Sequence, residues 1–268
     1  MKYHHAMENT EASGEGSSFD IQAVSRVGQI LGLYGPHTTE LSTTDVAERL
    51  GLNRTTAYRY CASLVSAGIL ERGRRRGTFV LGGLMLQLGI QALGRRRVID
   101  IAPPHLQELA SAVGMTAVLS LWGSRGPVVA LVQEDTSRTV VVTVHPGSQL
   151  DASSAQMRVF LAHLADTQLV ERILGGLPAL ARAELEAAVY TVRRTGSISV
   201  TLPDGLFAAA APVFDEHGIC ATIALLGADQ LADPAARGAV ISRLTDTAAA
   251  LSDELGIGRE GAPIEDLR

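Results

Sequence analysis

Arginine and hydroxyl side chains gather in one short segment of the sequence, between residues 54 and 59. The residues that carry these groups are Arg54, Thr55, Thr56, Tyr58 and Arg59. A guanidinium group pairs well with the O6 and N7 atoms of guanine, and hydroxyl groups commonly bond to phosphate oxygens. If the segment begins a helix, these side chains are suited to the major groove of DNA. The alternative is an ordinary solvated helix face.

A second basic group follows within twenty residues, around two glycines. Its members are Arg72, Arg74, Arg75 and Arg76. Arginines on a turn suit sequence-independent contact with phosphates or with the minor groove. For any single one of these arginines, a solvated surface charge is the competing explanation.

The charge of the chain is unevenly distributed along its length. The 268 residues carry a net charge of −5, but residues 20–97 hold eleven arginines against five acidic residues, a local charge of +6. From Val98 onward, eleven arginines face twenty acidic residues, a local charge of −9. This partition predicts a basic, DNA-binding first part and an acidic second part with another role.

Local signals place the basic residues on a winged helix-turn-helix. Apolar residues at helical spacing predict a helix over 20–34, and Ser42 with Asp45 predicts the capped start of a short helix that stops at Gly51. Asn53 is suited to cap a third helix that runs to about Ala67. The segment 69–82 then has apolar residues on both sides of the arginine-rich turn, which predicts a two-stranded hairpin.

The rest of the chain predicts an α+β domain with antiparallel pairing. We expect an apolar connecting helix near 83–93, helices near 98–113, 153–164, 181–194 and 234–255, and strands near 116–124, 127–134, 139–145, 197–201, 206–214 and 219–226. Turn signals at residues 123–126 and 215–218 favour hairpins. The leucines and isoleucine of the connecting helix predict burial against a partner subunit, with packing on its own domain as the alternative.

Several segments, in this order, resemble the IclR family of bacterial transcriptional regulators. They are LSTTDVAERLGLNRTTAYRYCASLVSAGILER, GTFVLGGLMLQLG, GSQLDASSAQMRVFLA and AAAAPVFDEHGICATIALLGA. The resemblance covers nearly all of residues 20–257. It implies a cytoplasmic homodimer or homotetramer that binds double-stranded operator DNA and has a GAF-like effector-binding domain.

The expected organisation follows from these elements and from the resemblance. We expect tails at 1–19 and 258–268, with the first disordered, a DNA-binding domain at 20–82, a connecting helix at 83–97, and an effector-binding and oligomerisation domain at 98–257.

Strand alternation and the resemblance together suggest where an effector binds. The candidate residues are Ser120, Trp122, Val142, Val144, Ser153, Ser154, Met157, Leu206, Ala208, Ala224 and Leu226. Val140 shares the expected face of Val142 and Val144. Ser153, Ser154 and the free amides of the helix that follows them could accept a carboxylate. Met157, Val159, Ala224 and Leu226 stand where the family usually has smaller or hydroxyl-bearing residues, which favours an apolar pocket for an organic acid, aromatic acids included. The alternative is that these residues are simply core.

Catalytic and metal-binding patterns are missing from the sequence. The seven histidines are scattered, and the two cysteines, Cys61 and Cys220, lie far apart. We therefore expect no catalytic residues, no metal and no cofactor, and no stretch is apolar enough to span a membrane. The favoured function is a transcriptional regulator, a repressor or an activator, of a catabolic gene cluster. The alternatives are an enzyme with a scaffolding winged-helix module and a DNA-binding protein without an effector.

Overall fold

The computed structural model describes residues 21–135, 142–202, 205–228 and 234–256. The chain divides into two compact units, with residues up to Met85 in the first and residues from Leu86 onward in the second. Each unit is built around its own apolar core, and each is described here by itself.

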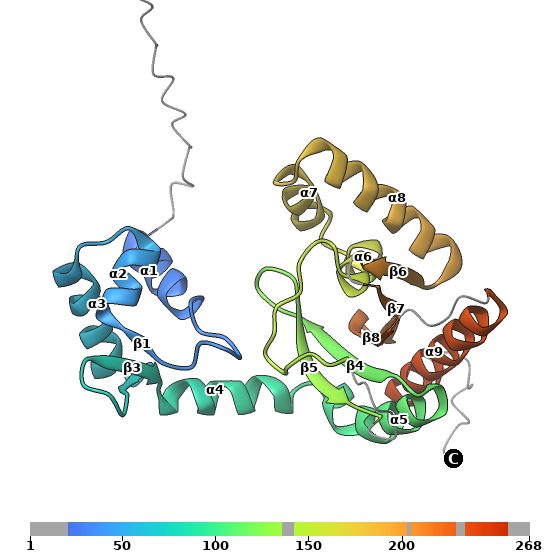
Figure 1. The fold of residues 1–268 in the computed structure, drawn as a ribbon, viewed down its shortest axis with the longest axis horizontal. Helices are drawn as coiled ribbons and strands as arrows, with labels where there is room; N and C mark the ends of the chain where they lie inside the picture. The colour runs from blue at the N-terminus through green and yellow to red at the C-terminus, as the bar shows by residue number, and fades with distance from the viewer. Residues whose placement is uncertain (1–20, 136–141, 203–204, 229–233, 257–268) are drawn as a thin grey trace, which may run out of the picture. The chain divides into compact units, whose positions relative to one another are not determined.

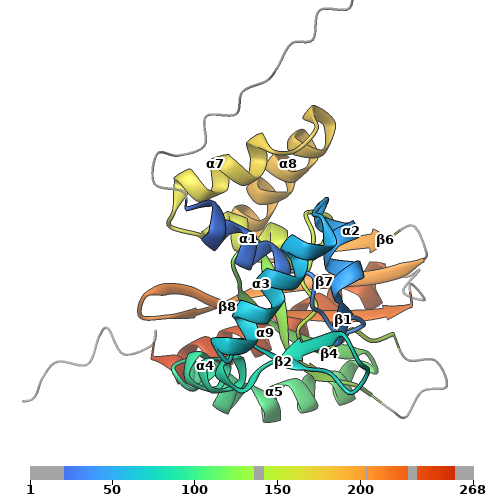
Figure 2. The same cartoon turned by 90° about the vertical axis from the view of Figure 1, so that its left-hand side faces the viewer.

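Three helices and a small sheet form the first unit (Figures 1 and 2). The helices are α1 (Gln22–Leu31), α2 (Thr43–Leu50) and α3 (Arg54–Ser66), and the strands are β1 (Leu41–Ser42), β2 (Leu70–Arg72) and β3 (Thr78–Leu81). The predicted hairpin is the antiparallel pair β2 and β3. The two-residue strand β1 was not predicted, and it pairs with the other edge of β3 to give the order β1-β3-β2.

The core of the first unit explains why its helices hold this arrangement. Ile30 of α1, Val46 of α2 and Cys61 of α3 are completely buried and belong to one cluster. The same cluster contains Leu41 of β1 and Phe79 of β3. Every element of the unit that flanks α3 is therefore fixed to it by apolar contact, which confirms the predicted winged helix-turn-helix.

The second unit is a five-stranded antiparallel sheet between two layers of helices (Figure 1). The sheet order is β5-β4-β8-β7-β6, from β4 (Thr116–Trp122), β5 (Pro127–Gln133), β6 (Ile198–Leu202), β7 (Leu206–Asp215) and β8 (Gly218–Ala228). Both predicted hairpins, β4 with β5 and β7 with β8, are present. This α+β architecture confirms the predicted fold class.

Because side chains alternate along each strand, the two faces of this sheet pack against different helices. Odd-numbered residues of β7, such as Phe207 and Ala209, pack with α5 (Arg97–Val113) and α9 (Pro234–Leu255). Even-numbered residues, such as Ala208 and Ala210, pack with α6 (Ala155–His163), α7 (Thr167–Gly175) and α8 (Ala179–Thr195). In Figure 2 the sheet lies between α7 and α8 above and α5 below. Helix α7, capped by the Asp166 side chain, was not predicted.

One predicted strand is wrong over its described part. Residues 142–145 form no strand, and residues 136–141, among them Val140, lie outside the described residues. Val142 instead supplies a backbone carbonyl oxygen that accepts a hydrogen bond from the Thr116 hydroxyl. The expected alternation of Val142 and Val144 on a strand face therefore has no basis here.

Both cysteines are buried and unpaired. Burial raises the pKa of Cys61, and burial together with the nearby Asp215 raises the pKa of Cys220 to about 12. Cys220 donates a weak hydrogen bond to the Val213 carbonyl oxygen, 3.4 Å away. Both thiols are therefore held in the protonated, unreactive form.

Candidate DNA interface and effector cavity

The N-terminal end of α3 presents the predicted DNA-contacting side chains. Asn53 caps this end, since its Oδ1 accepts a hydrogen bond from the Thr56 amide nitrogen at 2.7 Å. Arg54, Thr55, Tyr58 and Arg59 are exposed, whereas Thr56 is half-buried. The five predicted residues thus share one end of a single helix, and four of them are open to a partner.

The opposite side of α3 fixes the direction in which these side chains point. Ala57, Cys61 and Leu64 recur at helical spacing and are buried at 4% exposure or less. A rotation of the helix about its axis would expose this apolar stripe to water, which costs about 25 cal/mol per Å² of apolar surface. The arginines of α3 therefore face outward because its apolar residues must face inward.

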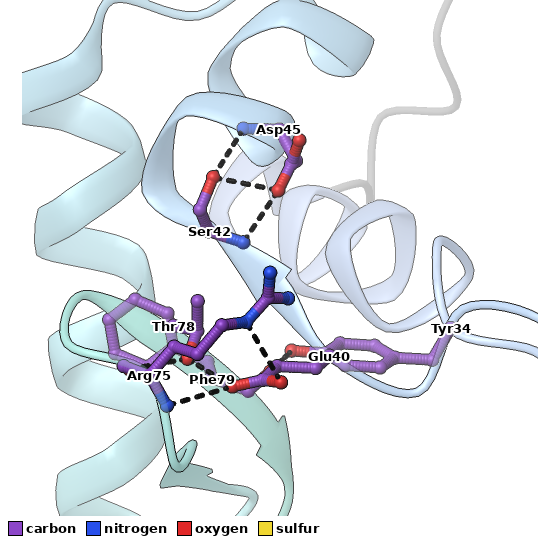
Figure 3. Close-up of polar contacts among 7 residues, drawn as sticks. All are labelled: Tyr34, Glu40, Ser42, Asp45, Arg75, Thr78 and Phe79. Carbon is purple, nitrogen blue, oxygen red and sulfur yellow. Dashed lines mark hydrogen bonds and ion pairs between the residues drawn. The ribbon is translucent and has the colours of Figure 1, made fainter.

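A capping box fixes the start of α2, the helix that precedes α3 in the motif. The Asp45 amide donates to Ser42 Oγ at 3.1 Å, and the Ser42 amide donates to Asp45 Oδ2 at 2.7 Å (Figure 3). The hydrogen bonds from the Ser42 side chain and backbone hold the pKa of Asp45 below its usual range. The carboxylate is therefore charged at neutral pH, which also suits the positive end of the helix dipole.

The last residue of β2 and the turn that follows it carry the second basic group. Arg72, Arg74, Arg75 and Arg76 are all exposed. Within the described part of the chain, only Arg75 of these four makes an ion pair: its Nε lies 3.4 Å from Oε2 of Glu40 (Figure 3). The wing is thus basic and accessible, but its four cations have different surroundings.

Tyr34 is a further residue that positions the wing. Its hydroxyl donates to the backbone carbonyl oxygen of Phe79 in β3, at 3.1 Å (Figure 3). Burial raises the pKa of Tyr34 to about 12, so the hydroxyl keeps its proton. Neither Glu40 nor Tyr34 was singled out from the sequence, because the contact with each depends on chain segments that are distant in sequence.

The second unit holds a cavity of about 240 Å³ at the N-terminal end of α6. Six of the predicted effector residues line it: Val144, Ser153, Ser154, Ala208, Ala224 and Leu226. Residues of the cavity that were not predicted are Gln149, Leu150, Asp151, Ala155, Gln156 and Val200. An apolar floor from three strands thus meets a polar rim from the segment 149–156.

Five predicted effector residues do not line this cavity, and each has a physical reason. Trp122 packs against Phe160, with ring centroids 5.3 Å apart, and Ser120 is fully buried within the sheet. Met157 is buried and lies so close to Gly126 that a Cβ on that glycine would sit 2.7 Å from the methionine Cε. Val142 follows the irregular path described above, and Leu206 stands at the very start of β7.

Hydrogen-bond donors without partners collect at the polar rim. The Ser154 side chain caps α6 by accepting from the Met157 amide at 3.1 Å, and the amides of Ala155 and Gln156 remain without an intrahelical partner. The Gln156 side chain is 5% exposed, and its Nε2 has no hydrogen-bond partner among the described residues. A buried amide without a partner is costly, so this arrangement favours an acceptor group from outside the chain.

The connecting helix α4 (Gly83–Gly94) exposes most of its apolar side chains. Leu86 is 66% exposed and Ile90 is 62% exposed. Leu88 and Leu93 are exposed as well.

None of the helices in the described ranges has the length and apolar character needed to cross a lipid bilayer. In the same ranges, no three His, Cys, Asp or Glu side chains are arranged to hold a metal ion.

Comparisons with known proteins agree with this geometry. Residues 23–74 match the sequence profile of the IclR helix-turn-helix domain. The chain is 30% identical over 105 residues to the HTH-type transcriptional regulator XynR of Escherichia coli K12, across 39% of this chain and 42% of XynR. It is 28% identical over 260 residues to the glycerol operon regulatory protein of Streptomyces griseus, across 90% of this chain and 98% of that protein.

A solved structure shows the same fold over both units. It is an IclR homologue from Microbacterium hydrocarbonoxydans in complex with 4-hydroxybenzoate, with a TM-score of 0.69 and 20% identity. The alignment covers 87% of this chain and 98% of the homologue.

The winged helix-turn-helix with its exposed basic helix end defines the class of protein, which is a DNA-binding transcriptional regulator. Full-length similarity to a regulator of the same kind extends this class to the whole chain. More particularly, its helix-turn-helix is of the IclR type over residues 23–74, and the chain is similar over most of its length to the transcriptional repressor IclR of Escherichia coli K12, as the ordered sequence segments predicted.

Proposed function

We propose that this protein is a ligand-controlled regulator of a catabolic gene cluster, in which a small organic acid changes operator binding. The observation that carries the proposal is the cavity of the second unit, whose apolar floor and unpaired donors are suited to such a ligand. Ligand binding in the acidic second unit would give the protein a means of controlling DNA binding by its basic first unit.

On the DNA side, we assign base-edge contacts to the exposed end of α3. Arg54 and Arg59 are the side chains best suited to guanine, whereas Thr55, Thr56 and Tyr58 suit phosphates and neighbouring base edges. The wing arginines supply sequence-independent attraction to the backbone. In this proposal residues 20–82 form the DNA-binding domain, and residues 98–257 form the effector-binding and oligomerisation domain.

On the ligand side, size and chemistry favour a single-ring acid. An apolar cavity of roughly 150 Å³ is large enough to take up benzene, so about 240 Å³ leaves room for one ring with small substituents. Val200, Ala208 and Leu226 offer the ring an apolar surface. The 4-hydroxybenzoate bound by the homologue belongs to this size class and carries the carboxylate that the α6 amides would accept.

Among the described residues that line the cavity, Asp151 is the one acidic residue, and its carboxylate is already engaged. Oδ1 of Asp151 accepts from the Ser153 amide at 2.9 Å and from the Ser153 hydroxyl at 2.5 Å. These bonds turn one of its oxygens toward the loop and spread part of its negative charge. An anionic ligand is therefore expected to place its carboxylate on the Ala155 and Gln156 side of the rim.

We further propose that the protein is a cytoplasmic homodimer, or a homotetramer built from such dimers, without enzymatic activity. The exposed apolar side chains of α4 support this, because a helix with such a surface gains stability when a second copy covers it. Paired DNA-binding domains would then read two half-sites about one helical turn apart, or a multiple of it.

Operator binding with and without ligand tests the proposal. The full chain would be titrated onto its upstream DNA by fluorescence anisotropy, with 4-hydroxybenzoate and its neutral analogue 4-hydroxybenzamide as additives. We expect the acid to change the affinity for the operator and the amide to have a much weaker effect. Equal operator affinity in all three conditions, with a panel of other single-ring acids equally inactive, would contradict ligand control by such an acid and leave DNA binding intact.

A further inference from the structure

The four arginines of the wing differ in one respect that the sequence does not show. Arg75 is bonded to its own protein, whereas Arg72, Arg74 and Arg76 make no ion pair within the described residues. Only charges that are free to meet phosphates displace counterions from DNA. The number of phosphate contacts that the wing makes can therefore be smaller than its number of arginines.

Glu40 is the residue that makes this difference. Glu40 precedes β1, and its carboxylate accepts from three donors, which belong to Arg75 of the turn and to Thr78 at the start of β3 (Figure 3). The Arg75 backbone amide donates to Oε1 at 3.3 Å, the Thr78 hydroxyl donates to the same oxygen, and the Arg75 guanidinium contacts Oε2. The hydrogen bond from Thr78 and the contacts from Arg75 hold the pKa of Glu40 below its usual range.

The space that this carboxylate occupies is provided by Gly73. A Cβ at position 73 would lie 2.2 Å from Oε1 of Glu40 and 2.5 Å from Oγ1 of Thr78. No side chain fits there while the carboxylate stays in place. The pairing of β1 with β3 brings Glu40 to this point from the other side, so the clamp consists of one acid, one glycine and two residues of the turn.

The surroundings of the pair explain why Arg75 stays on the protein. The Arg75 side chain is 75% exposed, and an exposed ion pair on its own contributes little. However, the amide and the guanidinium of the same residue converge on one carboxylate that Thr78 also holds. If the guanidinium left for a phosphate, it would leave an uncompensated carboxylate beside a polyanion, which Coulomb repulsion disfavours.

We propose that Glu40 is a positioning residue of the DNA interface: it clamps the turn 73–78 and retains Arg75, so that only Arg72, Arg74 and Arg76 of the wing carry positive charge to phosphates. The clamp lowers sequence-independent affinity without touching the base-reading end of α3. A regulator that must leave random DNA to find its operator benefits from this restraint.

The test is the salt dependence of binding by the full chain to a labelled random-sequence duplex, measured by fluorescence anisotropy. Each phosphate contact contributes a slope of about 0.9 in the logarithm of affinity against the logarithm of salt. Arg74→Ala and Arg76→Ala should each flatten the slope by about that amount for each wing bound. Arg75→Ala should leave the slope nearly unchanged, although it removes the same formal charge.

The matched variant Glu40→Gln separates the clamp from a merely structural role. Glutamine keeps an acceptor for Thr78 and for the Arg75 amide, but it no longer holds the guanidinium by charge. The slope should then steepen by about 0.9 per wing bound, which makes affinity fall roughly 3.5-fold further between 50 and 200 mM salt. Adding Arg75→Ala to Glu40→Gln should restore the wild-type slope.

Two results would overturn the proposal. One is a slope for Arg75→Ala in the wild-type background that flattens as much as that of Arg74→Ala. The other is an unchanged slope for Glu40→Gln with its circular dichroism and melting temperature intact. Because wild-type binding to the duplex is measured first, a failure of DNA binding itself would be recognised separately.

Discussion

Ser42 and Asp45 satisfy each other's backbone amides across the first turn of α2, at 3.1 Å and 2.7 Å. The pair sets where α2 begins, and α2 in turn supports α3 through Val46 and Ala47, which lie in the same core cluster as Ala57 of α3. Reciprocal hydrogen bonds from side chain to backbone between two residues three positions apart thus help to place α3.

Asp45→Asn should destabilise the protein by about 1 kcal/mol at neutral pH. The folded state lowers the pKa of Asp45, so its contribution is present above the unfolded pKa of about 3.9 and is lost as the pH falls through the lower folded value. Urea denaturation of both proteins at neutral pH and near pH 3 checks this. A stability difference that persists unchanged at the acidic pH would contradict the role of the carboxylate charge.

Arg59→Ala should weaken operator binding by about 1–3 kcal/mol and relax base preference at one position of each half-site. The exposed guanidinium makes no ion pair within the described residues, so the fold should be unaffected. Arg26→Ala on α1 is the matched control, since it removes the same charge from another helix of the same unit, where Arg26 donates to Gln29. Overlapping binding curves for wild type and Arg59→Ala would remove this residue from the interface.

Gly73→Ala should expel the Glu40 carboxylate, because the new Cβ would lie 2.2 Å from Oε1. We expect a loss of roughly 1–3 kcal/mol from overpacking, seen as a lower melting temperature. The variant should also reproduce the steeper salt slope of Glu40→Gln. Gly28→Ala, where a Cβ meets nothing within 4 Å, is the control and should leave the salt slope unchanged.

Gln156→Leu should abolish the thermal stabilisation by a single-ring acid, because it removes the buried donor at the cavity while roughly preserving volume. For the wild type, a hundredfold excess of ligand over its dissociation constant should stabilise the fold by about 2.7 kcal/mol. Ala224→Leu should have the same effect by filling the floor. If both variants respond to the ligand like the wild type, the acid binds elsewhere.

Ile90→Lys on α4 should shift the protein toward monomers and weaken operator binding, since a charge would lie in the proposed interface between two copies. Light scattering after size exclusion reports the mass directly. Leu180→Lys on α8 changes a leucine that is 75% exposed and serves as the control. An Ile90→Lys variant with the mass of the wild type would argue against α4 as the contact.

The first unit was largely predictable because its signals are local. Ser42, Asn53 and Gly51 act within one turn of the helices that they begin or end, so their roles can be recognised from neighbouring residues. The pairing of β1 with β3 joins residues that are nearly forty positions apart. The Glu40 clamp depends on that pairing, and no sequence pattern indicated it.

The effector cavity was only partly predictable for a different reason. Alternation correctly assigned Ala208, Ala224 and Leu226 to one face of the sheet, but it cannot tell which part of that face a helix will cover. Ser120 is fully buried, Phe160 of α6 packs on Trp122, and the cavity lies at the first turn of α6. Helix packing as well as strand alternation therefore decides which residues line the cavity.

The burial of both thiols makes this protein suitable for site-directed labelling without prior removal of its cysteines. Cys61 and Cys220 are buried and have raised pKa values, so thiol-reactive probes should not react with them in the native state at neutral pH. One cysteine introduced at Ser66, on the exposed part of α3, would then be the single reactive position of the chain. In the proposed dimer, a spin label there would report the separation of the two α3 helices directly, with and without an effector.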